Sequence, residues 1–199
     1  MTAKVLCKAH NEGLSTVDSA GKHAFDALRM MMQTRNAREK MKRGSWKVKQ
    51  YRIDGALLER WFLKTLINLC LHGATPIGRD TSQPGVVPEH LVRAAYGRER
   101  LSGDAGLYSV VQAGMQISST DSFAFAPLIK DLKHVEGGLF LFRGFCYLLF
   151  LEPDGPPHPL TGISIEGIDV GQCQLNFHNR RVTDNERGCK SQVLEVEWD

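Results

Sequence analysis

The stretch from Asp54 to Gly73, DGALLERWFLKTLINLCLHG, constrains the fold more than any other part of the chain. Its apolar residues recur at helical spacing and would cover most of the circumference of a helix. Asp54 is a favourable N-cap residue, and Gly73 can adopt the left-handed conformation that ends many helices. Such a helix would be about 30 Å long, the width of a small domain. The sequence therefore predicts a long central helix that is buried on most of its sides.

One line of this helix is polar, because Arg60, Lys64, Asn68 and His72 recur at every fourth position. This pattern predicts a single stripe that faces solvent or a partner. The charged residues Glu59, Arg60 and Lys64 within the run argue against a membrane-spanning segment.

A second helix is predicted from Ser15 onward, and Ser15 and Asp18 have the spacing of a capping box with Asp in place of the usual Glu. Its predicted buried face has apolar residues at steps of three or four: Val17, Ala20, Ala24, Leu28, Met31 and Met32. We expect this helix to pack on the central one. A third, short helix is predicted just after Pro88.

Beyond Gly106 the pattern changes to alternating or continuously apolar residues, which is typical of strands. Strands are predicted at 107–117 and 123–129, the second at an edge or bulge because it contains Pro127. Residues 139–151 predict either a hairpin or one kinked strand, and 172–182 and 191–199 a final strand pair.

The predicted fold class is therefore α+β, with N-terminal helices packed on a largely antiparallel β-sheet formed by the C-terminal half. A chain of 199 residues with 42% hydrophobic content can bury the core of a single domain. We expect one domain over 1–199, with a mainly helical half at 1–105 and a β-sheet half at 106–199.

Positive charge is concentrated in residues 35–52, where eight basic residues accompany one acidic residue, Glu39. The eight are Arg35, Arg38, Lys40, Lys42, Arg43, Lys47, Lys49 and Arg52. The whole chain has a formal net charge of only +3, so the remainder is net negative.

Two interpretations of this basic segment are open. Lys and Arg side chains could neutralise phosphates while Trp46 and Tyr51 stack on exposed bases, with Arg60 and Lys64 extending the surface. Alternatively, Lys47 and Lys49 form the solvated face of an edge strand whose other face buries Trp46 and Val48.

Cys7 and His10 are three residues apart, a spacing that suits half of a tetrahedral zinc site. Zinc needs further ligands, and the sequence offers no second pair of this kind, so the alternative is a buried thiol and a histidine in a turn. The five cysteines are scattered and the N-terminal residues lack the apolar core of a secretory signal, so we expect a reducing, cytoplasmic setting.

The segments VLCKAHNEGLSTVD, at 5–18, and IDGALLERWFLKTLINL, at 53–69, resemble uncharacterised bacterial proteins related to the HNH endonucleases. The resemblance implies that Cys7 matches a structural zinc ligand and that His10 and Asn11 begin the helix of the motif. The family's first ligand pair and catalytic histidine come upstream of this point, whereas only six residues precede Cys7 here.

Three functional hypotheses follow. The first is a non-catalytic nucleic-acid-associated or regulatory protein derived from an HNH-like ancestor. The second is a metal-dependent, HNH-type nuclease, with zinc as its expected ion, completed by a partner chain or by upstream residues. The third is a protein-interaction module that binds no nucleic acid. The sequence has no dinucleotide-binding, phosphate-loop, zinc-protease or esterase motif, which argues against those activities.

Overall fold

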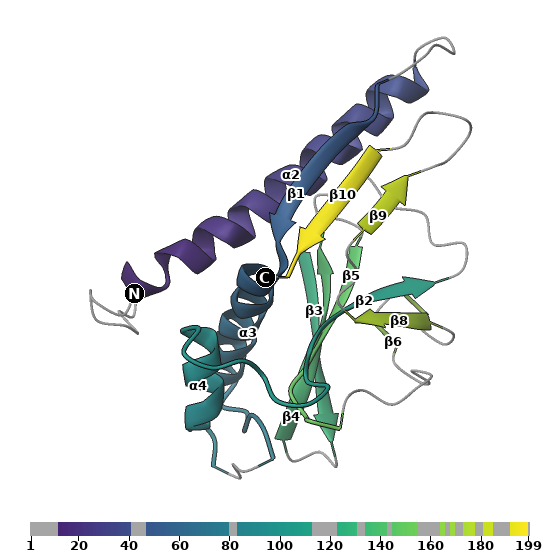
Figure 1. The fold of residues 1–199 in the computed structure, drawn as a ribbon. Coiled ribbons are helices and arrows are strands. Elements are labelled where there is room, and N and C mark those ends of the chain that lie inside the picture. Colours follow the sequence, from purple (N-terminus) through teal and green to yellow (C-terminus); the bar gives the residue numbers. More distant parts are fainter. Residues whose placement is uncertain are drawn as a thin grey trace.

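The structure is a computed structural model that describes residues 12–40, 47–79, 83–112, 123–130, 134–142, 145–154, 164–165, 168–169, 173–177, 181–184 and 192–198. Helix α2 runs across the long dimension of the molecule, and α3 descends beside a sheet (Figure 1). Helices from the first half pack on strands that come mainly from the second half, so the predicted α+β class is confirmed.

Helix α2 spans Ser15–Glu39 and buries the predicted apolar face against α3 and β1 (Lys49–Asp54). Val17, Leu28 and Met31 have almost no exposed surface. The capping-box prediction is wrong, because the N-cap position is Leu14 and no side chain caps the helix. Asp18 instead forms an ion pair with Lys64 of α3.

Helix α3 spans Gly55–His72 and is the central helix predicted from the sequence. The Asp54 carboxylate accepts a hydrogen bond of 2.8 Å from the Leu57 amide and thereby caps the helix. Gly73 does not take the left-handed conformation, since its φ is −80°. The left-handed residue is Ala74, one position later, with a φ of 49°.

The larger sheet has five strands in the order β3-β4-β5-β2-β8, and every described pairing in it is antiparallel. The bounds are β2 Gly106–Gln112, β3 Phe123–Lys130, β4 His134–Phe142, β5 Phe145–Phe150 and β8 Cys173–Phe177. The apolar run at 139–151 forms the predicted hairpin of β4 and β5. Strand β3, which contains Pro127, lies at the sheet edge and has an irregular register after Leu128.

A smaller sheet has the order β1-β10-β9, with β9 at Arg181–Asp184 and β10 at Gln192–Glu197. Strand β1 pairs with β10 in parallel, which joins chain segments about 140 residues apart. The predicted pairing of the last two β segments is only partly right, because β8 pairs with β2 while β9 pairs with β10. Two short strands, β6 (Ser164–Ile165) and β7 (Ile168–Asp169), pair with each other.

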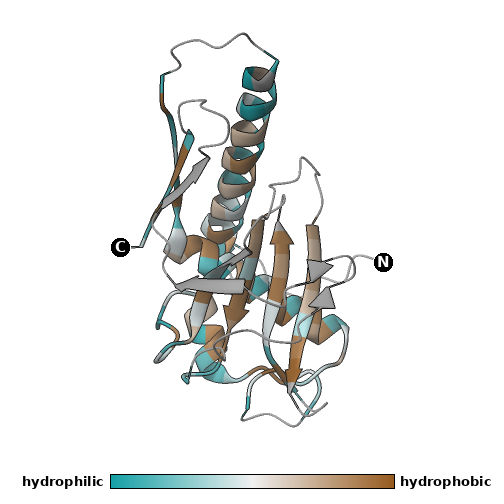
Figure 2. Ribbon diagram, turned by 90° about the vertical axis from the view of Figure 1, so that its right-hand side faces the viewer, coloured by the Kyte–Doolittle hydropathy of each residue, from teal (hydrophilic) through white to brown (hydrophobic). Residues whose placement is uncertain are grey.

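The core is centred on α3 and extends from α2, β1 and β10 on one side to the α4 helix (Glu89–Ala95) and the larger sheet on the other. Phe62 of α3 stacks near Phe140 of β4 and Tyr147 of β5, with ring centroids 4.7 and 5.3 Å apart. Several strands drawn in colour are strongly hydrophobic, whereas the end of α2 that leads to β1 is hydrophilic (Figure 2). None of the helices among the described residues combines the length and the hydrophobicity that a membrane span requires.

Candidate nucleic-acid interface

The C-terminal end of α2 and the start of β1 lie together at one end of the molecule, far from the α3–α4 end (Figure 1). The Arg38 guanidinium donates a hydrogen bond of 2.9 Å to the Lys47 carbonyl and so joins the two segments. We refer to the described basic residues of these two segments as the basic tip: Arg35, Arg38, Lys40, Lys47 and Lys49. Lys42 and Arg43 lie between the segments in sequence and outside the described residues.

A chain of hydrogen bonds anchors the basic tip to the interior. The Lys49 ammonium donates to the Thr34 hydroxyl at 3.4 Å, and Thr34 lies 3.0 Å from the Tyr51 hydroxyl. Tyr51 donates to the side-chain carbonyl of Gln192 at 3.3 Å, and the Gln192 amide donates to the Met31 carbonyl at 2.9 Å. The Thr34 and Tyr51 hydroxyls each accept one hydrogen bond and donate another. This series of bonds provides partners for the side-chain amide of Gln192, which is buried in β10.

Tyr51 is therefore a structural residue, with only 8% of its surface exposed. A ring this buried cannot stack on a nucleic-acid base, which corrects the prediction that Tyr51 offers a stacking surface. Its ring lies 5.3 Å from the Lys49 ammonium, a distance typical of a cation–π contact. Trp46, the other aromatic residue of this prediction, lies outside the described residues.

The edge-strand interpretation of the basic segment is half right. Strand β1 is an edge strand of the smaller sheet, but its buried residues are Tyr51 and Ile53. Val48 precedes the strand and is 51% exposed, so the prediction that it is buried is wrong. The Lys49 side chain lies on the same face as Tyr51, because residues two apart in a strand share a face.

Arg52 points to the opposite face of β1 from Lys49, away from the basic tip. Its Nε atom lies 3.4 Å from a Glu195 carboxylate oxygen and 3.7 Å from one of Glu197. Both glutamates belong to β10, and the parallel register places Glu195 directly beside Arg52. The charge of Arg52 is thus matched locally by carboxylates, unlike that of Lys40 or Lys47, which form no ion pair with a described residue.

Arg60 and Lys64 also lie apart from the basic tip, on α3. The Arg60 Nε donates to the Ala95 carbonyl at 3.2 Å, and its guanidinium packs against Gly97, where a side chain would collide with it. The Lys64 ammonium lies 2.5 Å from an Asp18 carboxylate oxygen and only 16% of its side chain is exposed. Of the predicted polar stripe, Arg60 therefore joins α3 to α4, and Lys64 joins it to α2.

Cys7 and His10, the predicted zinc ligands, lie outside the described residues. The structure contains another polar cluster that the sequence analysis did not single out: His134, Glu136 and Glu152 offer ligand atoms that all lie within 4.8 Å of one another. The pair His134 and Glu136 could have been recognised from the sequence, because residues two apart on one strand have their side chains on one face. Glu152 carried no such signal, because its place beside them depends on strand pairing.

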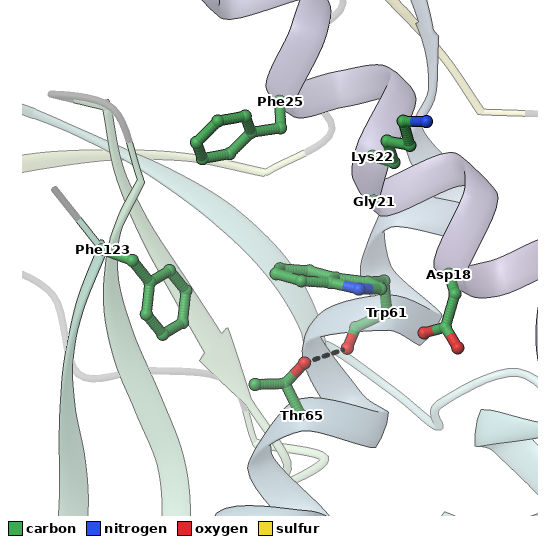
Figure 3. A pocket seen from close by; sticks show the side chains of 7 residues that line it. All are labelled: Asp18, Gly21, Lys22, Phe25, Trp61, Thr65 and Phe123. Atoms are coloured by element: carbon green, nitrogen blue, oxygen red, sulfur yellow. Dashed lines mark hydrogen bonds between the residues drawn. The ribbon is translucent and has the colours of Figure 1, made fainter. Parts of the chain in front are cut away.

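A largely apolar pocket of about 430 Å³ lies between α2, α3 and the start of β3 (Figure 3). The Trp61 ring forms its floor, with Phe25 and Phe123 on one side and Asp18 on the other. Thr65 also lines it and donates a hydrogen bond to the Trp61 carbonyl. The pocket is a feature of helix packing, with Gly21 directly above the indole ring.

Comparisons of the chain with protein-family models, with curated proteins and with solved structures find no match. Fold and site geometry are therefore the basis for a functional assignment, and the relation to HNH endonucleases stays a prediction.

Proposed function

We propose that this protein binds nucleic acid non-catalytically through the basic tip. The observation that supports the proposal is the convergence of five Lys and Arg residues from two separate segments at one protruding end of the molecule. Polyanionic backbones are bound by such clusters because each neutralised phosphate releases counterions, a term that does not depend on base sequence.

The fixed geometry of the basic tip strengthens this argument. Lys49 is tied to α2 through Thr34, and Arg38 is tied to the β1 segment through the Lys47 carbonyl. Side chains held in place lose less conformational entropy when they contact a ligand. Lys40 and Lys47 are exposed beside these anchored residues and would add charge at the periphery.

The test is a fluorescence anisotropy titration of labelled single-stranded and double-stranded oligonucleotides with the full chain. The double substitution Lys40→Ala and Lys47→Ala removes two charges from the basic tip without removing a described side-chain contact. We expect affinity to fall about tenfold or more at low salt, because two phosphate contacts are lost.

The matched control is the double substitution Arg29→Ala and Arg52→Ala. It removes the same number of positive charges, but each of these arginines is paired with a carboxylate, Arg29 with Asp26 and Arg52 with Glu195. We expect the control to bind nearly as well as the wild type. If both double variants lose affinity for the oligonucleotides equally, overall charge and not the basic tip governs binding, and the proposal is refuted.

A further inference from the structure

Three ligand-type side chains are gathered where the β4–β5 hairpin meets the segment after α3. His134 and Glu136 are two residues apart at the start of β4, and Glu152 follows β5 by two residues. The backbone fixes their relative positions: the Leu151 amide donates to the Glu136 carbonyl at 2.8 Å, and the Val135 amide donates to the Pro76 carbonyl at 2.9 Å. The cluster is thus built on rigid elements of the larger sheet.

The spacing within the cluster is wrong for direct hydrogen bonding and right for a shared ion. The His134 Nε2 atom lies 3.7 Å from a Glu136 carboxylate oxygen, beyond hydrogen-bonding distance. Two ligands that each lie about 2.1 Å from one metal ion and subtend an angle of about 120° are separated by about 3.6 Å. The three ligand atoms lie within 4.8 Å of one another, so the widest separation would shorten by about 1.2 Å at most for all three to reach this spacing.

The His134 Nε2 atom is an independent sign of a missing ligand. It is buried from solvent and has no hydrogen-bond partner among the described residues. A buried nitrogen of this kind costs free energy unless a proton acceptor, a donor or a metal ion satisfies it. The neutral imidazole nitrogen is also the commonest metal ligand among protein side chains.

Acidic groups outnumber basic ones among the described residues at the cluster. Among the described residues the basic group there is Arg79, with its Nε atom 2.7 Å from a Glu152 oxygen and a terminal nitrogen 3.2 Å from Asp154. The described residues therefore place the three carboxylates of Glu136, Glu152 and Asp154 around one arginine, an acidic setting that suits a cation.

We infer that His134, Glu136 and Glu152 form a binding site for a first-row divalent cation, Zn²⁺ or Mn²⁺. One imidazole nitrogen and two carboxylates are a donor set that both ions accept. Only 5% of the Glu152 side chain is exposed, and its bond to Arg79 would orient the carboxylate as outer-shell partners of metal ligands do.

A cavity of about 380 Å³ adjoins the site and would give an open coordination position access to small molecules. Glu152 and Arg79 line it together with His90 of α4 and Ser102. A site with three protein ligands and an open position is the arrangement found in catalytic metal centres, whereas structural zinc sites are usually closed by four ligands. The inference does not depend on nucleic-acid binding, because the cluster lies at the opposite end of the molecule from the basic tip (Figure 1).

The test is isothermal titration calorimetry of the metal-stripped full chain with Zn²⁺, repeated with Mn²⁺. We expect one ion per chain at this site, and at least a tenfold loss of affinity for Zn²⁺ in both His134→Ala and Glu152→Gln. Glu152→Gln keeps the size of the side chain and an oxygen that can accept from Arg79, so the fold is retained even if His134→Ala destabilises it. Far-UV circular dichroism confirms the fold of each variant.

Two control variants separate this site from other histidines and from the predicted Cys7–His10 pair. His23→Gln changes an exposed histidine of α2 and should leave binding at this site unchanged. Cys7→Ala should likewise leave the Mn²⁺ isotherm unchanged. The inference is overturned if the wild type binds neither ion, or if Glu152→Gln binds both as tightly as the wild type does.

Discussion

Helix α2 packs closely on Trp61 of α3 at Gly21, and substituting this glycine tests how tightly the two helices are packed. A methyl group built at Gly21 would lie 2.5 Å from the Cδ1 and Nε1 atoms of Trp61 and 2.6 Å from Cε2. Optimal contacts between carbon atoms are about 3.5 to 4.0 Å, so the indole ring must move by about 1 Å in Gly21→Ala.

The cost of this movement can be estimated from the surroundings of the ring. Trp61 makes edge-to-face contacts with Phe62 and Phe123, at centroid distances of 5.1 and 6.3 Å, and a shift would disturb both. Overpacking of this kind costs about 1–3 kcal/mol. Replacing glycine with alanine in a helix interior stabilises the helix by about 0.5–1 kcal/mol. The middle of these two ranges gives an expected loss of about 1 kcal/mol in the free energy of unfolding for Gly21→Ala.

Urea unfolding followed by circular dichroism measures the change, with Gly13→Ala as the matched control. A methyl group at Gly13 would meet Tyr96 at an ordinary distance of 3.6 Å, so this control should differ from the wild type by less than about 0.5 kcal/mol. In a Trp61→Leu background the collision is removed, and Gly21→Ala should become neutral or stabilising. The reasoning is refuted if Gly21→Ala is as stable as the wild type while Trp61 is present.

Two further predictions concern buried polar groups. Tyr51→Phe should lower the free energy of unfolding by about 1–3 kcal/mol, because the buried Gln192 carbonyl loses its donor; unchanged stability in urea would contradict the hydrogen-bond chain described above. Burial raises the pKa of Glu59, even though its carboxylate accepts from the Leu107 amide and lies near Arg100. The folded state therefore holds this proton more tightly than the unfolded state, and the wild type loses stability as pH rises from about 4 through the folded pKa. Glu59→Gln should gain stability relative to the wild type between pH 4 and pH 7. If the free energies of unfolding of the two proteins change with pH in parallel, the raised pKa of Glu59 in the folded state is disproved.

The sequence predicted those parts of the fold that depend on local patterns. The helix at 55–72 has an N-cap and an apolar periodicity that do not depend on distant residues, and the Asp54 cap forms as expected. The hairpin of β4 and β5 was likewise predictable, because its two strands are neighbours in sequence.

Long-range pairing was the part that could not be predicted. The parallel contact of β1 with β10 joins Tyr51 to Leu194, and nothing near either residue indicates the other. Because this register also fixes Glu195 beside Arg52, the loss of Arg52 from the basic surface could not be foreseen. Local signals also failed where tertiary contacts compete with them, as when Asp18 pairs with Lys64 and leaves the α2 terminus uncapped by a side chain.

The same limit applies to the candidate sites. The density of Lys and Arg in 35–52 located the basic tip, but alternation along β1 separates Lys49 from Arg52, and burial removes Tyr51 from the surface. For the carboxylate–histidine cluster, the sequence contains only the pair His134 and Glu136. Glu152 joins them because β5 runs antiparallel to β4 and returns the chain to the same end of the sheet.

The salt dependence of oligonucleotide binding tests the proposed function most directly. The logarithm of the association constant for duplex DNA should fall linearly with the logarithm of salt concentration, with a slope of about −0.9 for each phosphate contacted. Five basic residues would give a slope as steep as about −4.5, and Lys40→Ala with Lys47→Ala should reduce its magnitude by about 2. A slope near zero in the wild type, or the same slope in the wild type and this double variant, would contradict binding through the basic tip.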